Sequence, residues 1–440
     1  MKWPPSEKAR WIATLAAFVL LLVLATIRRL EIAEAVLAGE IEGATPHLSG
    51  DASSYYRLAM RTPLPGFSTE REPVIVADGR IALAVGGDLD AGLMEEARDD
   101  AARQRVLENH AMLRRWSIVH GLMAMGALFG CALLVAGRCG ALVASLLWAD
   151  NLWLSLYGVG FLREDIAAAC TLGLVSALVM LFRVPPERRR ARLVLAAAAA
   201  AAGALLALTR LEGLGTATLL VGLWAAARAA SKRFVRADAW LAPGIVAGVW
   251  LLASPYLIYN TAKTGSPLHP MQNHAQFWRN HEFAGQPGFP TRADVVANSY
   301  CGAPETPFHY VFGLHSLPEV AVRYVSGLWA GYTRYLTRLL ADRAWLAWLV
   351  PLAAAGLAWM RRWEAAFVIG AGLVALLPFA FILTLDTVLT AQPIGPTGVE
   401  PRFALTTLPF AFLWLAGGVG AAVEWIKRRS DSASVDGQAA

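Results

Sequence analysis

The run WIATLAAFVLLLVLATI, from Trp11 to Ile27, is the stretch on which the fold of this chain depends. Lipid offers no hydrogen-bond partner to a backbone N–H or C=O group, so an apolar run of this length predicts a helix that crosses a membrane. Lys8 and Arg10 precede the run and would also suit a cleaved signal peptide, but its end, LATIRRL, is a poor small-residue cleavage site. We expect an uncleaved first span.

The rest of the chain has the same apolar character. Hydrophobic residues make up 56% of the 440 residues and charged residues 16%, and the mean hydropathy is +0.46. This leaves too little polar surface to cover a soluble protein of this size. Lys and Arg collect at the ends of apolar runs and not on one basic face, which argues against a nucleic-acid partner. The four cysteines have no CxxC spacing and indicate neither a disulfide framework nor a zinc site.

About ten runs are long and apolar enough for a membrane helix, so the sequence predicts an all-α polytopic membrane protein. The runs are Trp11–Ile27, Ser117–Ala136, Ala141–Tyr157, Ile166–Phe182, Leu193–Leu208, Leu214–Ala227, Leu241–Tyr259, Ala344–Trp359, Ala365–Leu385 and Phe403–Ala422.

Basic residues gather in every second short connection, for example in RVPPERRRAR, Arg183 to Arg192. Cytoplasmic connections carry the excess of Lys and Arg, so both chain termini are expected in the cytoplasm. Two long connections, 28–116 and 260–343, then lie outside. Loops of this length are usually functional.

Residues 1–430 are expected to form a single transmembrane domain, and the small, polar segment 431–440 is expected to be a disordered cytoplasmic tail. Within the second outer loop, residues 319–340 place apolar side chains at helical spacing among Arg, Trp and Tyr. That pattern is typical of a helix that lies in the membrane interface, although an eleventh span is the alternative.

The stretch LSGDASSYYRLAM, Leu48 to Met60, lies in the first outer loop. Gly50 and Asp51 form a turn signal before a helical pattern, so Asp51 is placed to cap a helix. A surface cap is one interpretation of Asp51, and a functional carboxylate is the other.

Four further phrases bear on this choice, and together with the Asp51 stretch they resemble the GT-C group of integral-membrane glycosyltransferases. That group includes protein O-mannosyltransferases and aminoarabinose transferases. The phrases are FSTEREPVI at 67–75, YGVGFLREDIAAACTLGLVSALVMLF at 157–182, ALTRLEGLGTATLLVGLW at 207–224 with SPYLIYNTAKTGSPLHP at 254–270, and EPRFALTTLPFAFLWLAGG at 400–418. The resemblance spans most of the chain from Gly50 to Gly418. It departs from the usual pattern in the charged segment after REP, and at Phe403 and Thr407, where the group commonly has Tyr and Pro.

The resemblance implies a catalytic base at Asp51, accompanied by Tyr55 and Tyr56 as second-rank site residues. It implies that Glu72 or Glu70 assists the base or contacts a divalent metal, and that Glu164 lies near the donor. No cofactor is required with certainty, and the metal ligands stay unassigned.

The chemistry supports these assignments independently. Moving a sugar from a lipid phosphate to a hydroxyl needs a carboxylate to take the proton and cations to hold the departing phosphate. Arg71, Arg210 and Arg402 are the phosphate candidates, because the guanidinium fork matches a phosphate. The structural alternative is snorkelling, or an ion pair of Arg210 with Glu212 and of Arg402 with Glu400.

Other polar residues have simpler interpretations. Acids beside Arg163 sit at a predicted helix start, where they interact favourably with the helix dipole. Five histidines fall in the second outer loop, without metal-ligand spacing, and are expected to be solvated. They are His269, His274, His281, His309 and His315.

The favoured function is an inverting glycosyltransferase that moves a sugar from a polyprenyl-phosphate donor to an extracytoplasmic glycolipid, polysaccharide or protein. One alternative is a transporter or lipid flippase, for which Asp150 is the clear mid-span acid. Another is a ligase or polymerase of surface polysaccharides. The Ala- and Arg-rich composition is typical of a GC-rich bacterium, which would place the protein in the inner membrane with its site facing the periplasm.

Overall fold

The computed structural model describes residues 5–41, 44–48, 50–89, 100–360, 362–385 and 401–436, and within these ranges it contains helices and no strand. The predicted all-α class is therefore confirmed. The α-helices are α1 (Pro5–Leu37), α2 (Gly50–Arg61), α3 (Pro73–Gly86), α4 (Asp100–Asp150), α5 (Leu152–Gly158), α6 (Glu164–Arg183), α7 (Arg189–Thr209), α8 (Gly213–Ala230), α9 (Arg236–Thr264), α10 (His269–Phe283), α11 (Arg292–Ala297), α12 (Leu317–Ala330), α13 (Leu336–Leu339), α14 (Leu346–Met360), α15 (Arg362–Ala380) and α16 (Thr407–Asp436). Short π or 3₁₀ turns are η2 (His309–Gly313), η3 (Gly331–Tyr335), η4 (Ala341–Arg343), η5 (Ile382–Thr384) and η6 (Pro401–Ala404).

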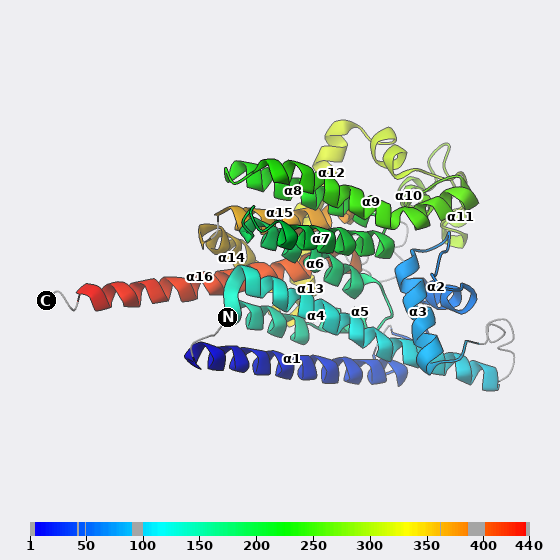
Figure 1. Cartoon of the computed structure of the whole chain (residues 1–440). Helices are drawn as coiled ribbons and strands as arrows, with labels where there is room; N and C mark the ends of the chain where they lie inside the picture. Colours follow the sequence, from blue (N-terminus) through cyan, green and yellow to red (C-terminus); the bar gives the residue numbers. More distant parts are fainter. Residues whose placement is uncertain are drawn as a thin grey trace.

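The long helices lie side by side in a bundle, with α16 and α6 packed on α4, and α7 packed on both α6 and α9. Figure 1 shows α2, α3, α10 and α11 gathered at one end of this bundle, while both chain termini lie at the opposite end. We call the first the outer end and the second the terminal end. The shared position of the termini agrees with an even number of crossings.

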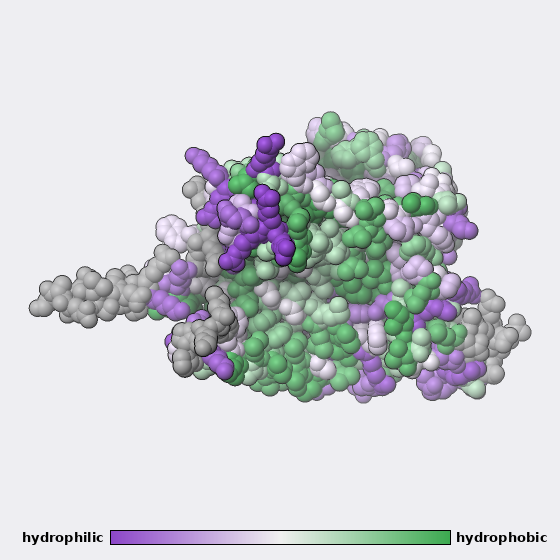
Figure 2. Space-filling model, viewed as in Figure 1, coloured by the Kyte–Doolittle hydropathy of each residue, from purple (hydrophilic) through white to green (hydrophobic). Residues whose placement is uncertain are grey.

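Eight helices in the described ranges are long and apolar enough to cross a membrane, and the chain is a multi-pass membrane protein. The side chains of Ile12, Val19 and Leu20 on α1 are 58%, 57% and 59% exposed, as expected for a helix that faces lipid. Hydrophobic side chains cover the middle of the face in view in Figure 2, with hydrophilic side chains toward both ends.

Helix α4 contains two of the predicted spans, because the chain changes direction at Gly137, where φ is 75° and ψ is −172°. The part before Gly137 runs antiparallel to α1 and the part after it runs parallel to α1. Four contacts fix these directions: Arg115–Glu34, Phe129–Phe18, Arg138–Trp11 and Asp150–Arg28. When the shorter helix α14 is included, an apolar helical segment corresponds to each of the ten predicted runs. The number of membrane crossings, ten, stays a prediction.

The first outer connection is largely helical. α1 continues to Leu37, α4 begins at Asp100, and α2 and α3 lie between them. Helices α2, α3 and α4 share a small hydrophobic core with Phe161 and the start of α6, and this core includes Tyr55 and Tyr56. Residues 319–340 form α12, η3 and α13, with α12 packed on α15; their place in the membrane interface stays a prediction. α16 continues to Asp436, into the segment expected to be a disordered tail.

A buried ion pair attaches the end of α1 to α6. Arg29 is 1% exposed, and its Nη1 donates to Asp165 Oδ2 at 2.7 Å. Gly121 on α4 and Gly158 on α5 leave room for this guanidinium, since a Cβ at either position would overlap Arg29 Nη1. The pair joins α1 and α6 just below the outer end, and α4 and α5 pack closely around it.

Gly121→Ala should displace Arg29 and leave Asp165 buried without its partner. Removing one partner of a buried ion pair costs about 3 kcal/mol, so the substitution should lower stability by roughly that amount. Gly126→Ala on the same helix is the matched control, because a Cβ there has no atom within 4 Å. The measurement is the loss of folded protein on heating in detergent, and equal behaviour of the two variants would contradict the argument.

Candidate active site

The centre of the site is the carboxylate of Asp51, in the first turn of α2. Its Oδ1 accepts a hydrogen bond from Arg71 Nη2 and its Oδ2 accepts one from Arg402 Nη2, both at 2.7 Å. Arg71 belongs to the segment between α2 and α3, and Arg402 belongs to η6, which precedes the last helix. Both oxygens of this carboxylate, for which a surface cap was one interpretation, therefore bind guanidinium groups from distant parts of the chain.

The protonation of Asp51 is set by opposing effects. Burial alone would raise its pKa, but the positive charges of Arg402, Arg71 and Arg163 lower it more strongly, so the pKa of Asp51 lies well below its usual range. The group is therefore ionised at neutral pH. Burial raises the pKa of Tyr55 above its usual range, so this phenol, which lies beneath the Arg71 guanidinium, stays neutral.

The segment that carries Arg71 is fixed from two sides. Glu72 is 0% exposed and forms an ion pair with Arg163, the residue before α6. The Oη of Tyr256 on α9 lies 2.8 Å from the carbonyl oxygen of Arg71 and 2.9 Å from that of Ser68. These contacts explain why the REP phrase and the SPYLIYN phrase lie together although they are far apart in sequence.

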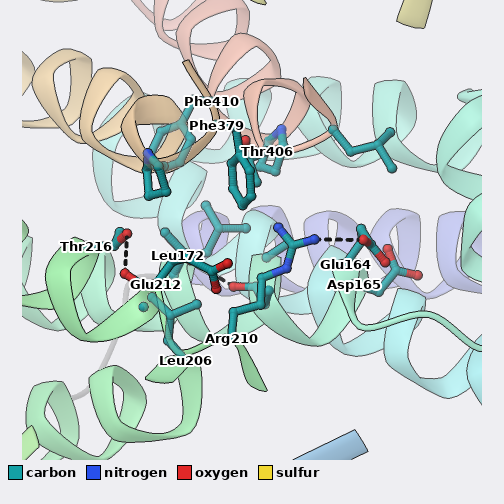
Figure 3. A pocket seen from close by; sticks show the side chains of 18 of the residues that line it. Glu164, Asp165, Leu172, Leu206, Arg210, Glu212, Thr216, Phe379, Thr406 and Phe410 are labelled. Carbon is teal, nitrogen blue, oxygen red and sulfur yellow. Dashed lines mark hydrogen bonds and ion pairs between the residues drawn. The ribbon is translucent and has the colours of Figure 1, made fainter. Parts of the chain in front are cut away.

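A further arginine of the site, Arg210, follows α7 directly. Its Nη2 donates to Glu164 Oε1 at 2.8 Å, and its guanidinium lies 4.7 Å from the centre of the Phe379 ring. Figure 3 shows the Arg210 side chain reaching toward Glu164 below this ring. The expected pairing of Arg210 with Glu212 is thus replaced by one with Glu164, and Glu212 Oε1 instead faces His274 Nδ1 at 3.3 Å. Arg402 binds Asp51, and its other expected partner, Glu400, lies outside the described residues.

A cavity of about 510 Å³ opens above Asp51. Its floor is polar and its walls, from α10, α11 and the end of α15, are largely aromatic. The charged residues that line it are Asp51, Arg71, Arg163, Arg210, Glu212 and Arg402. Four cations against two carboxylates give this lining a formal charge of +2, which favours an anionic ligand.

A smaller cavity of about 50 Å³ lies deeper in the bundle, between α6, α7, α8, α15 and α16. Glu164 and Asp165 line it together with apolar side chains such as Leu172 and Phe410 (Figure 3). Arg210 and Glu212 line both cavities. These two residues therefore stand at the boundary between the outer cavity and the apolar interior.

Four of the predicted site residues lie together, and the others are dispersed. Asp51, Arg71, Arg210 and Arg402 line the larger cavity, and their roles as base and phosphate contacts stay predictions. The remaining members do not line it. Glu72 and Tyr55 are buried behind Arg163 and Arg71, and Glu164 lines the smaller cavity. Tyr56 packs against His110 and accepts a hydrogen bond from Asn109, and Glu70 is exposed on the loop.

Sequence reasoning missed Arg163 and two histidines. Arg163 was assigned to a helix start, but it lines the cavity and pairs with Glu72. The prediction of solvated histidines is wrong for His281 and His315, which are 1% and 7% exposed. His315 Nε2 lies 3.0 Å from Glu282 Oε1. A helical spacing of His274 with the aromatic residues of α10 would have been the signal that this helix has a buried face.

The described residues do not suit a metal ion. Of the two acids expected to contact one, Glu72 is paired with Arg163 and Glu70 is exposed on the loop, and no group of three His, Cys, Asp or Glu side chains comes together in the part of the chain that the structure describes. Divalent metals need several such ligands around one point.

His281 gives a prediction for stability. Both of its ring nitrogens lie buried without a hydrogen-bond partner among the described residues, and burial lowers its pKa to about 4. Since an unfolded histidine titrates near ~6.5, the unfolded chain binds more protons between these values, and the free energy of unfolding falls as the pH is lowered through this window. His281→Gln should remove part of this acid sensitivity.

The measurement is the unfolding temperature in detergent between about pH 7.5 and 5, a range that covers the titration of the unfolded histidine. His269→Gln is the control, because His269 is on the same helix and does not line the cavity. If His281→Gln keeps the full pH dependence of the wild type, another group causes it.

No family model matches the chain, and no curated protein matches it either. Solved structures, however, do match the chain. The oligosaccharyltransferase of Archaeoglobus fulgidus in complex with Zn and sulfate matches 96% of this chain with a TM-score of 0.53 and 15% identity. Archaeal AglB from the same organism, in complex with an inhibitory peptide and a dolichol-phosphate, matches 94% at 0.53 and 15%. ArnT from Cupriavidus metallidurans bound to undecaprenyl phosphate matches 92% at 0.50 and 13%.

The chain spans only part of these proteins: 51% of the first oligosaccharyltransferase chain, 52% of AglB and 59% of ArnT. At this level of identity the likeness concerns the fold and not the reaction. The fold expected from the sequence motifs is confirmed, because the chain shares the fold of this oligosaccharyltransferase and of ArnT.

Proposed function

We propose that the protein is an inverting glycosyltransferase that moves a sugar from a polyprenyl-phosphate donor to an extracytoplasmic acceptor. The observation that carries the proposal is the carboxylate of Asp51, held by two arginines on the wall of a cavity at the outer end. The fold supports it, because AglB and ArnT, which share this fold, are described in complex with dolichol-phosphate and undecaprenyl phosphate.

The proton step belongs to Asp51. The acceptor hydroxyl gives its proton to this carboxylate while its oxygen attacks the anomeric carbon of the sugar. The bond between that carbon and the phosphate oxygen breaks, and the lipid phosphate leaves with the electron pair. Attack from the side opposite the leaving group inverts the anomeric centre.

The departing phosphate would bind the arginines that line the cavity. A guanidinium has five N–H donors, and in Arg71 one nitrogen, Nη2, binds Asp51. The other donors of Arg71 can bind phosphate oxygens in the fork geometry that suits them, and Arg402 adds a second positive charge beside the same carboxylate. Arg210, at the boundary with the apolar interior, is placed for a phosphate whose lipid tail lies between the helices.

The same contacts reconcile a low pKa with the role of a base. A carboxylate whose pKa lies far below neutrality is a poor proton acceptor. A phosphate bound to Arg71 and Arg402 would divert their positive charge from Asp51, and the pKa of Asp51 would then rise toward its usual range. Donor binding would therefore prepare the base, and an empty site would not activate water.

Orientation and location belong to the proposal as well. The site lies at the end opposite both termini, and basic connections lie at the terminal end (Figures 1 and 2). We infer that the termini are cytoplasmic, that the cavity faces the periplasm of a bacterial inner membrane, and that the acceptor is a glycolipid, polysaccharide or protein reached through the two outer connections.

The transporter alternative loses its main support in the structure. Asp150, the mid-span acid that favoured it, pairs with Arg28 at 2.7 Å and with Arg343. An acid held by two arginines of other segments has a sufficient structural role.

Asp51→Asn should keep the protein folded and abolish transfer, because the amide retains the shape but cannot accept the proton. The loss should be at least about 100-fold in rate, as expected when a general base is removed. Asp88→Asn, in the same outer connection but outside the cavity lining, is the matched control. The readout is mass spectrometry of surface glycans and glycolipids from cells with the wild-type gene, a deletion or either variant; full restoration by the Asp51→Asn copy would overturn the proposal.

Arg402→Ala should weaken donor use more than acceptor use. Losing a charge-assisted hydrogen bond to phosphate costs about 1.5–3 kcal/mol, which corresponds to a donor KM about 10- to 100-fold higher. Arg334→Ala, an exposed arginine in η3, should leave the KM unchanged. An unchanged donor KM in Arg402→Ala would remove Arg402 from the donor site.

A further inference from the structure

A second large groove lies far from Asp51, between α7 and α9. Its volume is about 920 Å³, and its mouth is formed by Arg189 and Arg236, the first residues of the two helices. Both helices end close to the candidate active site, at Thr209 and Thr264. The groove therefore opens at the terminal end of the bundle, where Figure 2 shows strongly hydrophilic side chains near the start of α9.

The mouth of the groove is cationic. Its sixteen lining residues include Arg189, Arg192 and Arg236 and no acid. Arg192 is 2% exposed and pairs with Asp238, but that carboxylate is shared with Arg228. Two buried arginines thus face one buried acid.

Arg192 also has further hydrogen-bond donors beside the one that binds Asp238. Its Nε and Nη1 are buried and have no hydrogen-bond partner among the residues that the structure describes. Buried guanidinium donors without an acceptor are costly, so their presence at the edge of a groove indicates a ligand that accepts hydrogen bonds.

Below the mouth the groove is an apolar trough. Ala196 and Ala200 of α7 face Gly244 and Gly248 of α9, and their small side chains leave the volume open. From Arg236 the lining extends to Leu252, about 24 Å along α9. The hydrocarbon layer of one leaflet is about 15 Å thick, so the trough is long enough for an acyl chain. Trp240, which is 75% exposed, lies one turn below the mouth, where aromatic side chains anchor proteins at the headgroups.

We propose that this groove binds one phospholipid with an anionic headgroup, whose phosphate accepts hydrogen bonds from Arg192, Arg189 and Arg236 and whose acyl chain fills the trough. Charge complementarity selects an anionic over a zwitterionic lipid, because the lining carries three positive charges and no negative one. The lipid comes from the leaflet opposite the candidate active site. The proposal does not depend on the transfer reaction.

The test is lipid binding to the full-length protein in detergent, measured by native mass spectrometry with phosphatidylglycerol and with phosphatidylcholine of the same acyl chains. A basic residue near a membrane surface contributes about fivefold to binding, so wild type should hold one phosphatidylglycerol at least about tenfold more tightly than phosphatidylcholine. For the same reason Arg189→Gln with Arg236→Gln should weaken phosphatidylglycerol binding about 20-fold. Arg188→Gln with Arg190→Gln removes the same charge from exposed neighbours outside the lining and should change binding less than about threefold.

A second variant tests the trough without altering charge. A Cβ at Gly244 meets no atom within 4 Å, so Gly244→Leu fills the groove without displacing the backbone and should abolish the bound lipid. Gly222→Leu, on α8 in equally open space, is the control and should bind normally. Equal binding of the two lipids, equal effects of the two arginine pairs, or unchanged binding in Gly244→Leu would each overturn the proposal. One-for-one displacement of phosphatidylglycerol by undecaprenyl phosphate would also overturn it, in favour of a polyprenyl-phosphate site.

Discussion

The pairing of buried arginines with carboxylates from distant segments is the constraint on which the rest of this structure depends. A charge inside an apolar bundle is tolerable only when it is paired and hydrogen-bonded. Arg29 of α1 meets Asp165 of α6, and Arg210 after α7 meets Glu164. These pairs lie just beneath the outer end, so the interactions that determine how the helices pack also determine where the polar floor of the cavity lies.

The contacts that form the site are therefore also contacts between the helices of the bundle. Tyr256 on a membrane helix holds the backbone at Arg71, and Glu72, the next residue, pairs with Arg163 at the start of another helix. Each guanidinium on the cavity wall is oriented by a carboxylate, which limits the number of conformations it can adopt. A preorganised cationic wall suits charge that develops on a leaving phosphate, because no reorganisation is needed when the charge appears.

The helical class and the apolar runs could be predicted because lipid forces each such run to satisfy its own backbone. Asp51, Arg71 and Arg402 could be proposed from motifs. The ion-pair partners of the arginines could not be predicted. For Arg210, sequence proximity suggested the neighbouring Glu212, but the fold brings Glu164 to it from 46 residues away. The burial of His281 was missed for a related reason. Its helix, α10, lines the cavity, and the polar sequence of that helix does not reveal which of its side chains become buried in tertiary contacts.

The separation of Arg402 from Asp51 by 351 residues has a consequence for biosynthesis. The carboxylate leaves the ribosome early and its second guanidinium only just before the last helix. A chain that has inserted all but its final segment already has the acid and most of the cavity wall, but it lacks one of the two arginines that hydrogen-bond the acid. The carboxylate therefore gains both of its arginine partners only when the segment before the last helix has been made.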